Sequence, residues 1–194
     1  MSSLENLFPK LPGQKYPIHI DWFPMLRGQS ITSRTVVSVN ADTGAAANVA
    51  ADVGVSGSIQ TFRVQGGNAG DKYKITASVT LTDGSIFEKD YYLDVVPNLR
   101  PLLELRKQSS EKIDLGIFFA KQLKDDTIST VSFLSTDMSG SSVDILVDRG
   151  FQDDLVSFRV QGGTSGQDYF VSAIVDTNGG YRYIEQVLIR VRDE

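Results

Sequence analysis

The chain has 194 residues, enough for one large domain or two small ones, and it lacks cysteine, which excludes disulfides and thiolate metal sites. Its hydrophobic content of 41% and charged content of 22% are typical of a soluble globular protein. The net charge of −5 argues against nucleic-acid or anionic-membrane partners, because both require a concentrated positive surface.

Residues 1–14 are predicted to form an extended N-terminal arm, because Pro9 and Pro12 interrupt any helix. Such an arm either folds back on its own domain or docks on a neighbouring subunit, since apolar side chains at a free end need a cover. Its candidate interaction residues are Leu4, Leu7, Phe8 and Leu11.

A first domain is expected at residues 15–97. Alternating apolar residues predict a strand over 16–23, and β-branched residues predict another over 31–39. The segment 40–58 is rich in alanine and favours a helix by propensity. Its counterpart at 135–155 has the alternation of a strand at Val143, Ile145 and Val147, so we expect strands in both places.

An internal repeat organises the whole chain. The segment 61–67, TFRVQGG, returns 96 residues later as SFRVQGG at 157–163, and matching Gly, Tyr, Ala and Val positions follow at the same distance. Earlier strands match at a distance of 97, which places a one-residue deletion in the middle of the second copy. The chain is therefore a tandem duplication.

In each copy, the repeated motif predicts a strand that ends at paired glycines, then two strands joined by a hairpin. Asp83-Gly84 in the first copy and Asn178-Gly179-Gly180 in the second are hairpin signals, and the former is typical of a type I′ turn. We therefore expect about seven short strands and no helix in each copy.

A linker is expected at residues 98–111, followed by the second domain at 112–194. The linker carries an apolar group, which either packs between the domains or contacts a partner. The residues of this group are Leu102, Leu103 and Leu105.

The strand pattern predicts an all-β fold of two tandem β-sandwiches. Tyr73 and Tyr169 each lie two residues before an inward apolar residue at the start of the penultimate strand. This placement resembles the tyrosine corner of immunoglobulin-like domains, in which the phenol hydroxyl bonds a backbone group of the loop.

No set of residues predicts catalysis, a cofactor or a metal. His19 is the single histidine, with no base, nucleophile or second ligand near it in sequence. The glycines at 66 and 67 precede a strand, whereas a phosphate loop precedes a helix. Aspartates at 42, 125–126 and 153–154 lack a calcium-ligand spacing and are read as turn residues.

The pattern F-R-V-Q-G-G-x-x-G-x-x-Y, present in both copies, resembles small immunoglobulin-like structural proteins of tailed bacteriophages. The first copy also carries the I-D-W motif at 20–22, where the second has Phe118-Phe119. The resemblance covers both sandwiches but neither the arm nor the linker.

This resemblance implies a non-enzymatic virion protein that is assembled in the host cytoplasm and binds other virion proteins. The implied roles are a neck, collar or fibre–tail adaptor, with a symmetric homo-oligomeric ring, or else capsid decoration. An alternative is a carbohydrate- or cell-surface-binding module that uses Trp22, Tyr73 or Tyr91-Tyr92.

Overall fold

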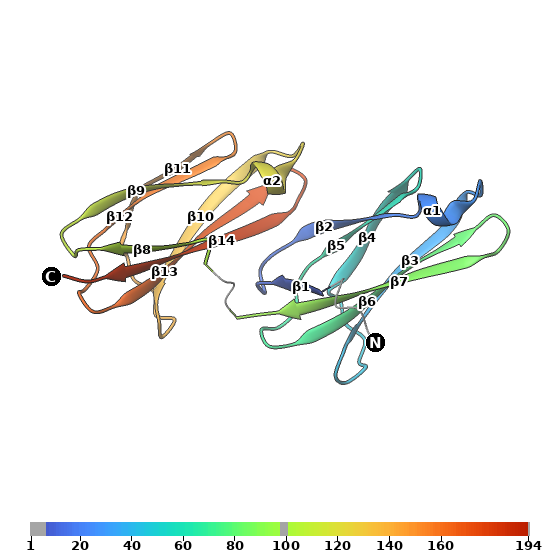
Figure 1. Ribbon diagram of the computed structural model, residues 1–194, viewed down its shortest axis with the longest axis horizontal. Helices are drawn as coiled ribbons and strands as arrows, with labels where there is room; N and C mark the ends of the chain where they lie inside the picture. The colour runs from blue at the N-terminus through green and yellow to red at the C-terminus, as the bar shows by residue number, and fades with distance from the viewer. Residues whose placement is uncertain (1–6, 98–100, 194) are drawn as a thin grey trace. The chain divides into compact units, whose positions relative to one another are not determined.

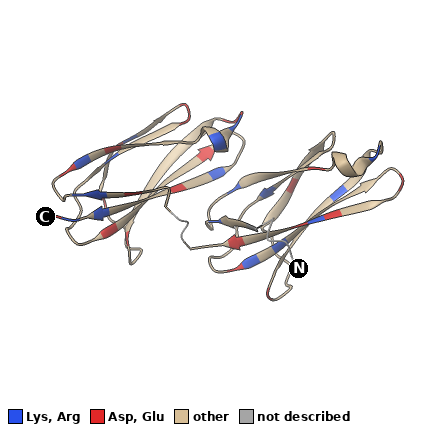
Figure 2. Cartoon of the chain, viewed as in Figure 1, with Lys and Arg blue, Asp and Glu red and all other residues tan. Residues whose placement is uncertain are grey.

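The computed structural model describes residues 7–97 and 101–193, apart from the side chain of Leu7. The chain divides into two compact units, Met1–Leu99 and Arg100–Glu194, and both are built from strands (Figure 1). Positively and negatively charged residues are interspersed along the strands of both units (Figure 2). The prediction of two tandem immunoglobulin-like sandwiches is confirmed.

The first unit packs a four-stranded sheet of order β1-β7-β6-β3 on a three-stranded sheet of order β2-β5-β4. All neighbours are antiparallel except β1 and β7, which are parallel. The strands are β1 Leu7–Lys10, β2 Tyr16–Asp21, β3 Ile31–Asn40, β4 Ala50–Ser56, β5 Ile59–Val64, β6 Lys72–Leu81 and β7 Ile86–Val95.

The second unit repeats this arrangement with sheets of order β10-β13-β14-β8 and β11-β12-β9. Here β8 and β14 form the parallel pair. The strands are β8 Leu103–Lys107, β9 Lys112–Phe118, β10 Ile128–Asp137, β11 Leu146–Gln152, β12 Leu155–Gln161, β13 Asp168–Thr177 and β14 Arg182–Val191.

The first strand of each unit lies in a segment that was expected, from the sequence, to lie outside the sandwiches. Strand β1 lies within the expected arm, and β8 lies within the expected linker. Pro9 obscured β1, yet proline is tolerated there because β1 is an edge strand whose outer side needs no donor. The expected linker therefore contributes its residues 103–107 to the second sandwich.

Each unit also contains a single helical turn that the strand pattern did not predict. These turns are α1, Phe23–Leu26, and α2, Ala120–Leu123. Each turn joins an edge strand of the three-stranded sheet, β2 or β9, to an edge strand of the four-stranded sheet, β3 or β10. In the first unit α1 is followed by Arg27 in the left-handed conformation with φ of 48°. The prediction of no helix was wrong at these two turns.

The alanine-rich segment forms no helix: its residues 50–56 form strand β4, as the comparison of the two copies predicted, and its alanines at 45–47 lie in the loop before that strand. The strand predicted around Val143, Ile145 and Val147 begins only at Leu146. The loop before β11 is one residue shorter than the loop before β4, which locates the deletion in the second copy.

Both hairpins after the repeated motif are type I turns followed by a glycine bulge, not type I′ turns. The N–H of Gly84 donates to Leu81 O at 3.0 Å and the N–H of Leu81 to Ser85 O at 2.8 Å. Gly84 has a φ of 83°, whereas Asp83 is not among the residues with positive φ. A three-residue loop needs only one positive φ, which Gly84 supplies.

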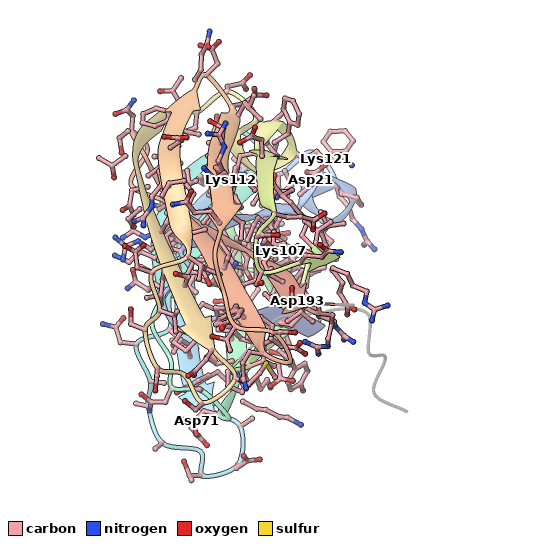
Figure 3. The ribbon with its side chains drawn as sticks, turned by 90° about the vertical axis from the view of Figure 1, so that its left-hand side faces the viewer. Asp21, Asp71, Lys107, Lys112, Lys121 and Asp193 are labelled. Atoms are coloured by element: carbon pink, nitrogen blue, oxygen red, sulfur yellow. The ribbon has the colours of Figure 1, made fainter. Side chains whose placement is uncertain are left out.

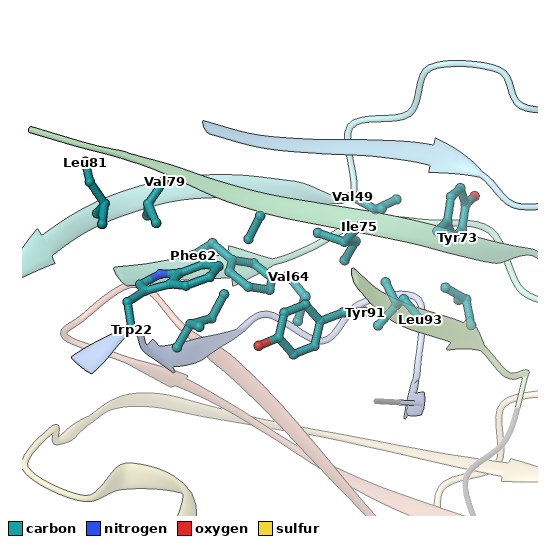
Figure 4. Close-up of a cluster of buried hydrophobic side chains, with 13 residues drawn as sticks. Trp22, Val49, Phe62, Val64, Tyr73, Ile75, Val79, Leu81, Tyr91 and Leu93 are labelled. Atoms are coloured by element: carbon teal, nitrogen blue, oxygen red, sulfur yellow. The ribbon is translucent and has the colours of Figure 1, made fainter. Parts of the chain in front are cut away.

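The core of the first unit is a cluster of side chains from both sheets, and Trp22, Phe62 and Ile75 are among its fully buried members (Figure 4). Successive residues of β6 alternate between exposed or half-buried and buried, as a strand between core and solvent requires. In the second unit, Phe119 and Phe158 occupy the positions that correspond to Trp22 and Phe62, and both are buried.

Candidate functional site

The candidate interaction residues near the N-terminus are part of the first sandwich wherever the structure describes them. Leu4 lies outside the described residues, and Leu7 pairs through its backbone with Tyr92. Phe8 is half-buried with its ring centroid 5.9 Å from that of Tyr91, and Leu11 is 5% exposed. Residues 7–11 thus fold back on their own domain, and a partner contact through them stays a prediction.

The candidate residues of the expected linker are more accessible. Leu102 is 59% exposed and Leu103 is 43% exposed, whereas Leu105 is half-buried in β8. Leu103 and Leu105 lie in β8, which pairs with the last strand β14, and the N–H of Leu102 donates to Gln186 O of β14 at 2.7 Å. A partner contact at Leu102 and Leu103 remains a prediction that their exposure permits.

A buried lysine closes one end of the first sandwich, a feature that the sequence reading missed. Lys10 is 0% exposed, and its ammonium donates to the carbonyl oxygens of Leu11 at 2.7 Å, Pro12 at 3.2 Å and Gly66 at 2.6 Å. The ammonium therefore ties the end of β1 to the first glycine of the repeated motif. Burial lowers the pKa of Lys10 to about 8.

The second unit repeats this lysine cage. The ammonium of Lys107 donates to the carbonyl oxygens of Gln108 at 2.5 Å, Ser109 at 3.5 Å and Gly162 at 2.7 Å. Burial lowers the pKa of Lys107, although the nearby carboxylates of Glu111 and Asp193 act in the opposite direction. Asp193 lies beside this cage (Figure 3).

The tyrosines of the repeated motif form the corners that the sequence predicted. The hydroxyl of Tyr73 accepts a hydrogen bond from the N–H of Asn68 at 3.2 Å and donates to Asp71 at 2.8 Å. The hydroxyl of Tyr169 accepts from the N–H of Thr164 at 2.9 Å. In both units the bond fixes the loop that follows the paired glycines.

Most of the alternative sites considered from sequence already have structural roles. His19 Nδ1 lies 2.9 Å from Thr61 Oγ1 on the exposed face of β2. Trp22 is 0% exposed, so its predicted role as an exposed glycan-binding aromatic was wrong. Within residues 7–97 and 101–193, no group of three or more metal-ligating side chains is placed to hold an ion.

A family model described as the podophage GP4 fiber-tail adaptor protein gp77 matches residues 10–94 and 107–190. The two matches cover most of the chain and begin at the two caged lysines. The chain belongs to this adaptor family. The resemblance to tailed-phage structural proteins is thereby confirmed, and each sandwich corresponds to one match.

Solved structures resemble this member of the adaptor family in fold alone. A chimeric titin Z1Z2 is 13% identical with a TM-score of 0.34, and the match covers 97% of this chain and 94% of that chain. The titin fragment I67–I69 is 10% identical with a TM-score of 0.31, over 97% of this chain and 64% of that chain. The Ig1–2 module of the Drosophila receptor tyrosine phosphatase DLAR is 9% identical with a TM-score of 0.30, over 97% and 94%.

This chain spans about 64% of the length of the titin I67–I69 fragment. Curated proteins give no match to the sequence. No helix in the described part of the adaptor is long and apolar enough to cross a membrane.

Both units also expose aromatic side chains that the sequence reading did not single out as candidate interaction residues. Phe23 is 72% exposed in the first unit, and Phe118 and Phe151 are 68% and 44% exposed in the second. The alternation over residues 16–23 places Phe23 on the same side as His19 and Asp21, which agrees with its exposure, although residues 23–26 form a one-turn helix and not the end of a strand.

The caged lysine of the first unit gives this adaptor a pH-dependent stability with a definite sign. The pKa of Lys10 is about 8 in the folded state and near 10.5 in the unfolded chain, so the unfolded chain binds more protons between these values. The free energy of unfolding should therefore rise as pH increases above 8, by at most about 1.4 kcal/mol per pH unit.

The fluorescence of Trp22, the only tryptophan of the chain, reports unfolding of the first unit in urea. We expect the urea midpoint to rise between pH 7 and pH 9.5 in the wild type, and to rise less in Lys10→Met. Lys107→Met should keep the wild-type pH dependence of this signal, because its cage lies in the other unit. Equal pH dependence in the wild type and Lys10→Met would contradict the assignment.

Proposed function

We propose that this protein is a non-enzymatic structural adaptor of a tailed-phage virion, and that it joins a fibre to the tail. The observation that carries the proposal is the match of a fibre–tail adaptor family to both units. An adaptor must hold two partners at once, and two copies of one sandwich provide two separate sets of edges and loops for this purpose.

The physical character of the chain supports this role. Each unit closes its own core, so the outer edges and loops are left for partner contacts. The edge strands β3 and β10, of ten residues each, offer backbone groups to which a partner strand can add. The net charge of −5 suits a position away from packaged DNA, because like charges repel.

The test is a phage in which the gene for this protein is deleted. We expect particles with a head and a tail but without fibres, and recovery of fibres when the intact protein is supplied in trans. Antibody labelling of wild-type particles by electron microscopy should mark the site where fibres meet the tail.

Particles that lack the protein but keep a full set of fibres would refute the adaptor role. Label spread over the head, with hundreds of copies in each particle, would instead indicate capsid decoration. Label at the neck with fibres unaffected would indicate a collar protein that does not hold fibres.

A further inference from the structure

The most exposed large apolar side chain that the structure describes projects from a constrained backbone. Phe23 begins α1 and is 72% exposed. Asp21 Oδ1 accepts hydrogen bonds from the N–H of Phe23 at 2.9 Å and from Ser58 Oγ at 2.7 Å, and Pro24 follows directly. These constraints fix the backbone at Phe23, which lowers the entropy that a contact through this ring would cost.

The fold does not require an aromatic residue at this position. In the second unit, α2 begins with Ala120 at the position that corresponds to Phe23, and the two turns are otherwise similar. Both turns are anchored alike, because the N–H of Trp22 donates to Ser58 O and the N–H of Phe119 donates to Asp154 O, each at 2.9 Å. The ring of Phe23 is thus an addition to one copy.

The second unit has a groove of about 410 Å³ beside Ala120, the residue that corresponds to Phe23. The groove lies between α2, the start of β10 and the turn between β11 and β12. Its lining includes the buried side chains Leu123 and Ile128, and the exposed ring of Phe151. Ala120 also lines it, and a larger side chain at that position would project into it.

The balance of charge differs between the two features. The lining of the groove includes the carboxylates of Asp126, Asp153 and Asp154 against the single cation of Lys124. The corresponding positions of the three aspartates in the first unit are Gln29, Gly57 and Ser58, which carry no charge. The acidic rim is therefore specific to the second unit.

Cations accompany Phe23. Arg27 follows one helical turn later and is exposed. Hydrogen bonds from the N–H of Phe23 and from Ser58 lower the pKa of Asp21, and the nearby charge of Lys89 lowers it further. Arg27 and Lys89 thus outnumber the one carboxylate bonded to Phe23, that of Asp21, and this balance favours the approach of Phe23 to the acidic rim of the groove.

We propose that Phe23 of one copy of this chain inserts into the groove beside Ala120 of a second copy. The contact is heterologous, because it joins the first unit of one copy to the second unit of the next. A heterologous contact that repeats from copy to copy closes into a ring when the rotation permits it. The inference rests on the proposed function for its biological role, since a ring would let several adaptors surround one tail.

The test uses purified full-length protein without fibre or tail proteins, so that a failure of this contact is separate from a failure of the adaptor role. Because the chain has no cysteine, single cysteines can be placed at will. Pro24→Cys marks the exposed turn beside Phe23, and Asp154→Cys marks the groove. A short bis-maleimide should join the two proteins when they are mixed and should join neither one to itself.

A protein that carries both cysteines should give a ladder of covalent multimers. Phe23→Ser should weaken self-association, measured by sedimentation equilibrium, by at least about tenfold, as expected for an aromatic anchor in a pocket. Ala120→Phe should do the same by filling the groove, and the first unit shows that this turn accepts phenylalanine. Phe118→Ser is the matched control, because it removes another exposed phenylalanine outside the groove and should leave self-association unchanged.

Three results would overturn the proposal. A cross-link within one chain alone would mean that no second copy occupies the groove. A dimer of Pro24→Cys with itself would indicate an isologous contact instead. Absence of self-association, combined with fibre or tail binding that Phe23→Ser or Ala120→Phe abolishes, would assign these surfaces to another virion protein.

Discussion

Replacing Trp22 with alanine is expected to lower the free energy of unfolding of the first unit by about 3–5 kcal/mol, the usual cost of removing a large buried aromatic. Trp22 is 0% exposed and lies in the core between the two sheets (Figure 4). Because the variant loses the fluorescent reporter, hydrogen exchange of the backbone amides of β5 and β6 is the appropriate measurement. Exchange in β12 and β13 of the second unit serves as the internal control and should not change.

The indole of Trp22 also belongs to a buried hydrogen-bond chain. Its Nε1–H donates to Gln60 Oε1 at 3.1 Å, and Gln60 Nε2 donates to the backbone oxygen of Thr35 at 3.4 Å. Gln60 is 0% exposed. The second unit has Phe119 and Val156 at the two corresponding positions, and both are 0% exposed. One copy thus has the polar pair, and the other has an apolar pair in its place.

Because the second unit has an apolar pair where the first has Trp22 and Gln60, a double-mutant cycle on these two residues is informative, and hydrogen exchange can again be the measurement. Trp22→Phe alone leaves Gln60 Oε1 buried without its donor, and Gln60→Val alone leaves the indole N–H without its acceptor. Each single change should cost about 1–3 kcal/mol for the unsatisfied group. The double variant reproduces the pair of the second unit and should cost less than the sum of the two. Strict additivity would show that the hydrogen bond does not couple the two side chains.

The sequence predicted the two sandwiches because both copies show the same pattern of strands. Where one segment has a high helix propensity, the strand pattern of its counterpart in the other copy is the stronger evidence. The alanine-rich segment shows this, since its counterpart identified it as a strand. Strands β1 and β8 were not identified, because a short edge strand gains its pairing from the last strand of the unit, which is distant in sequence.

Single side chains were less predictable than the strands. A lysine next to apolar residues does not reveal whether its ammonium reaches solvent or, as in Lys10, turns toward carbonyl oxygens of a distant loop. The buried ring of Trp22 and the exposed ring of Phe23 follow the alternation over residues 16–23, but that pattern did not predict that Phe23 begins a helical turn. The groove beside Ala120 is not predictable from the sequence, because its lining comes from α2, the start of β10 and the turn between β11 and β12, which only the fold brings together.

The paired glycines of the repeated motif are expected to resist substitution unequally. Gly67 has a φ of 85°, and a Cβ there would lie 2.8 Å from Val95 Cγ2 and 3.1 Å from Tyr73 Cε2, both of which are in the core. Neither neighbour has room to move, because Val95 is 0% exposed and Tyr73 is hydrogen-bonded to its loop. Gly67→Ala thus combines a left-handed backbone penalty of roughly 1–2 kcal/mol with an overpacking cost of roughly 1–3 kcal/mol.

We therefore expect Gly67→Ala to destabilise the first unit by about 2–5 kcal/mol, the sum of those two costs, as measured by the urea midpoint of Trp22 fluorescence. Gly66→Asn is the matched control, because the nearest atom to its Cβ would be 3.6 Å away and asparagine tolerates the φ of 57°. In the second unit, the Cβ that Gly163→Ala adds would lie 2.8 Å from Val191 Cγ2, the corresponding close contact. It should leave the Trp22 midpoint unchanged while lowering the stability of the second unit, because each unit has its own core. A loss of Trp22 stability in Gly163→Ala would instead mean that the two sandwiches of this adaptor unfold as one cooperative body.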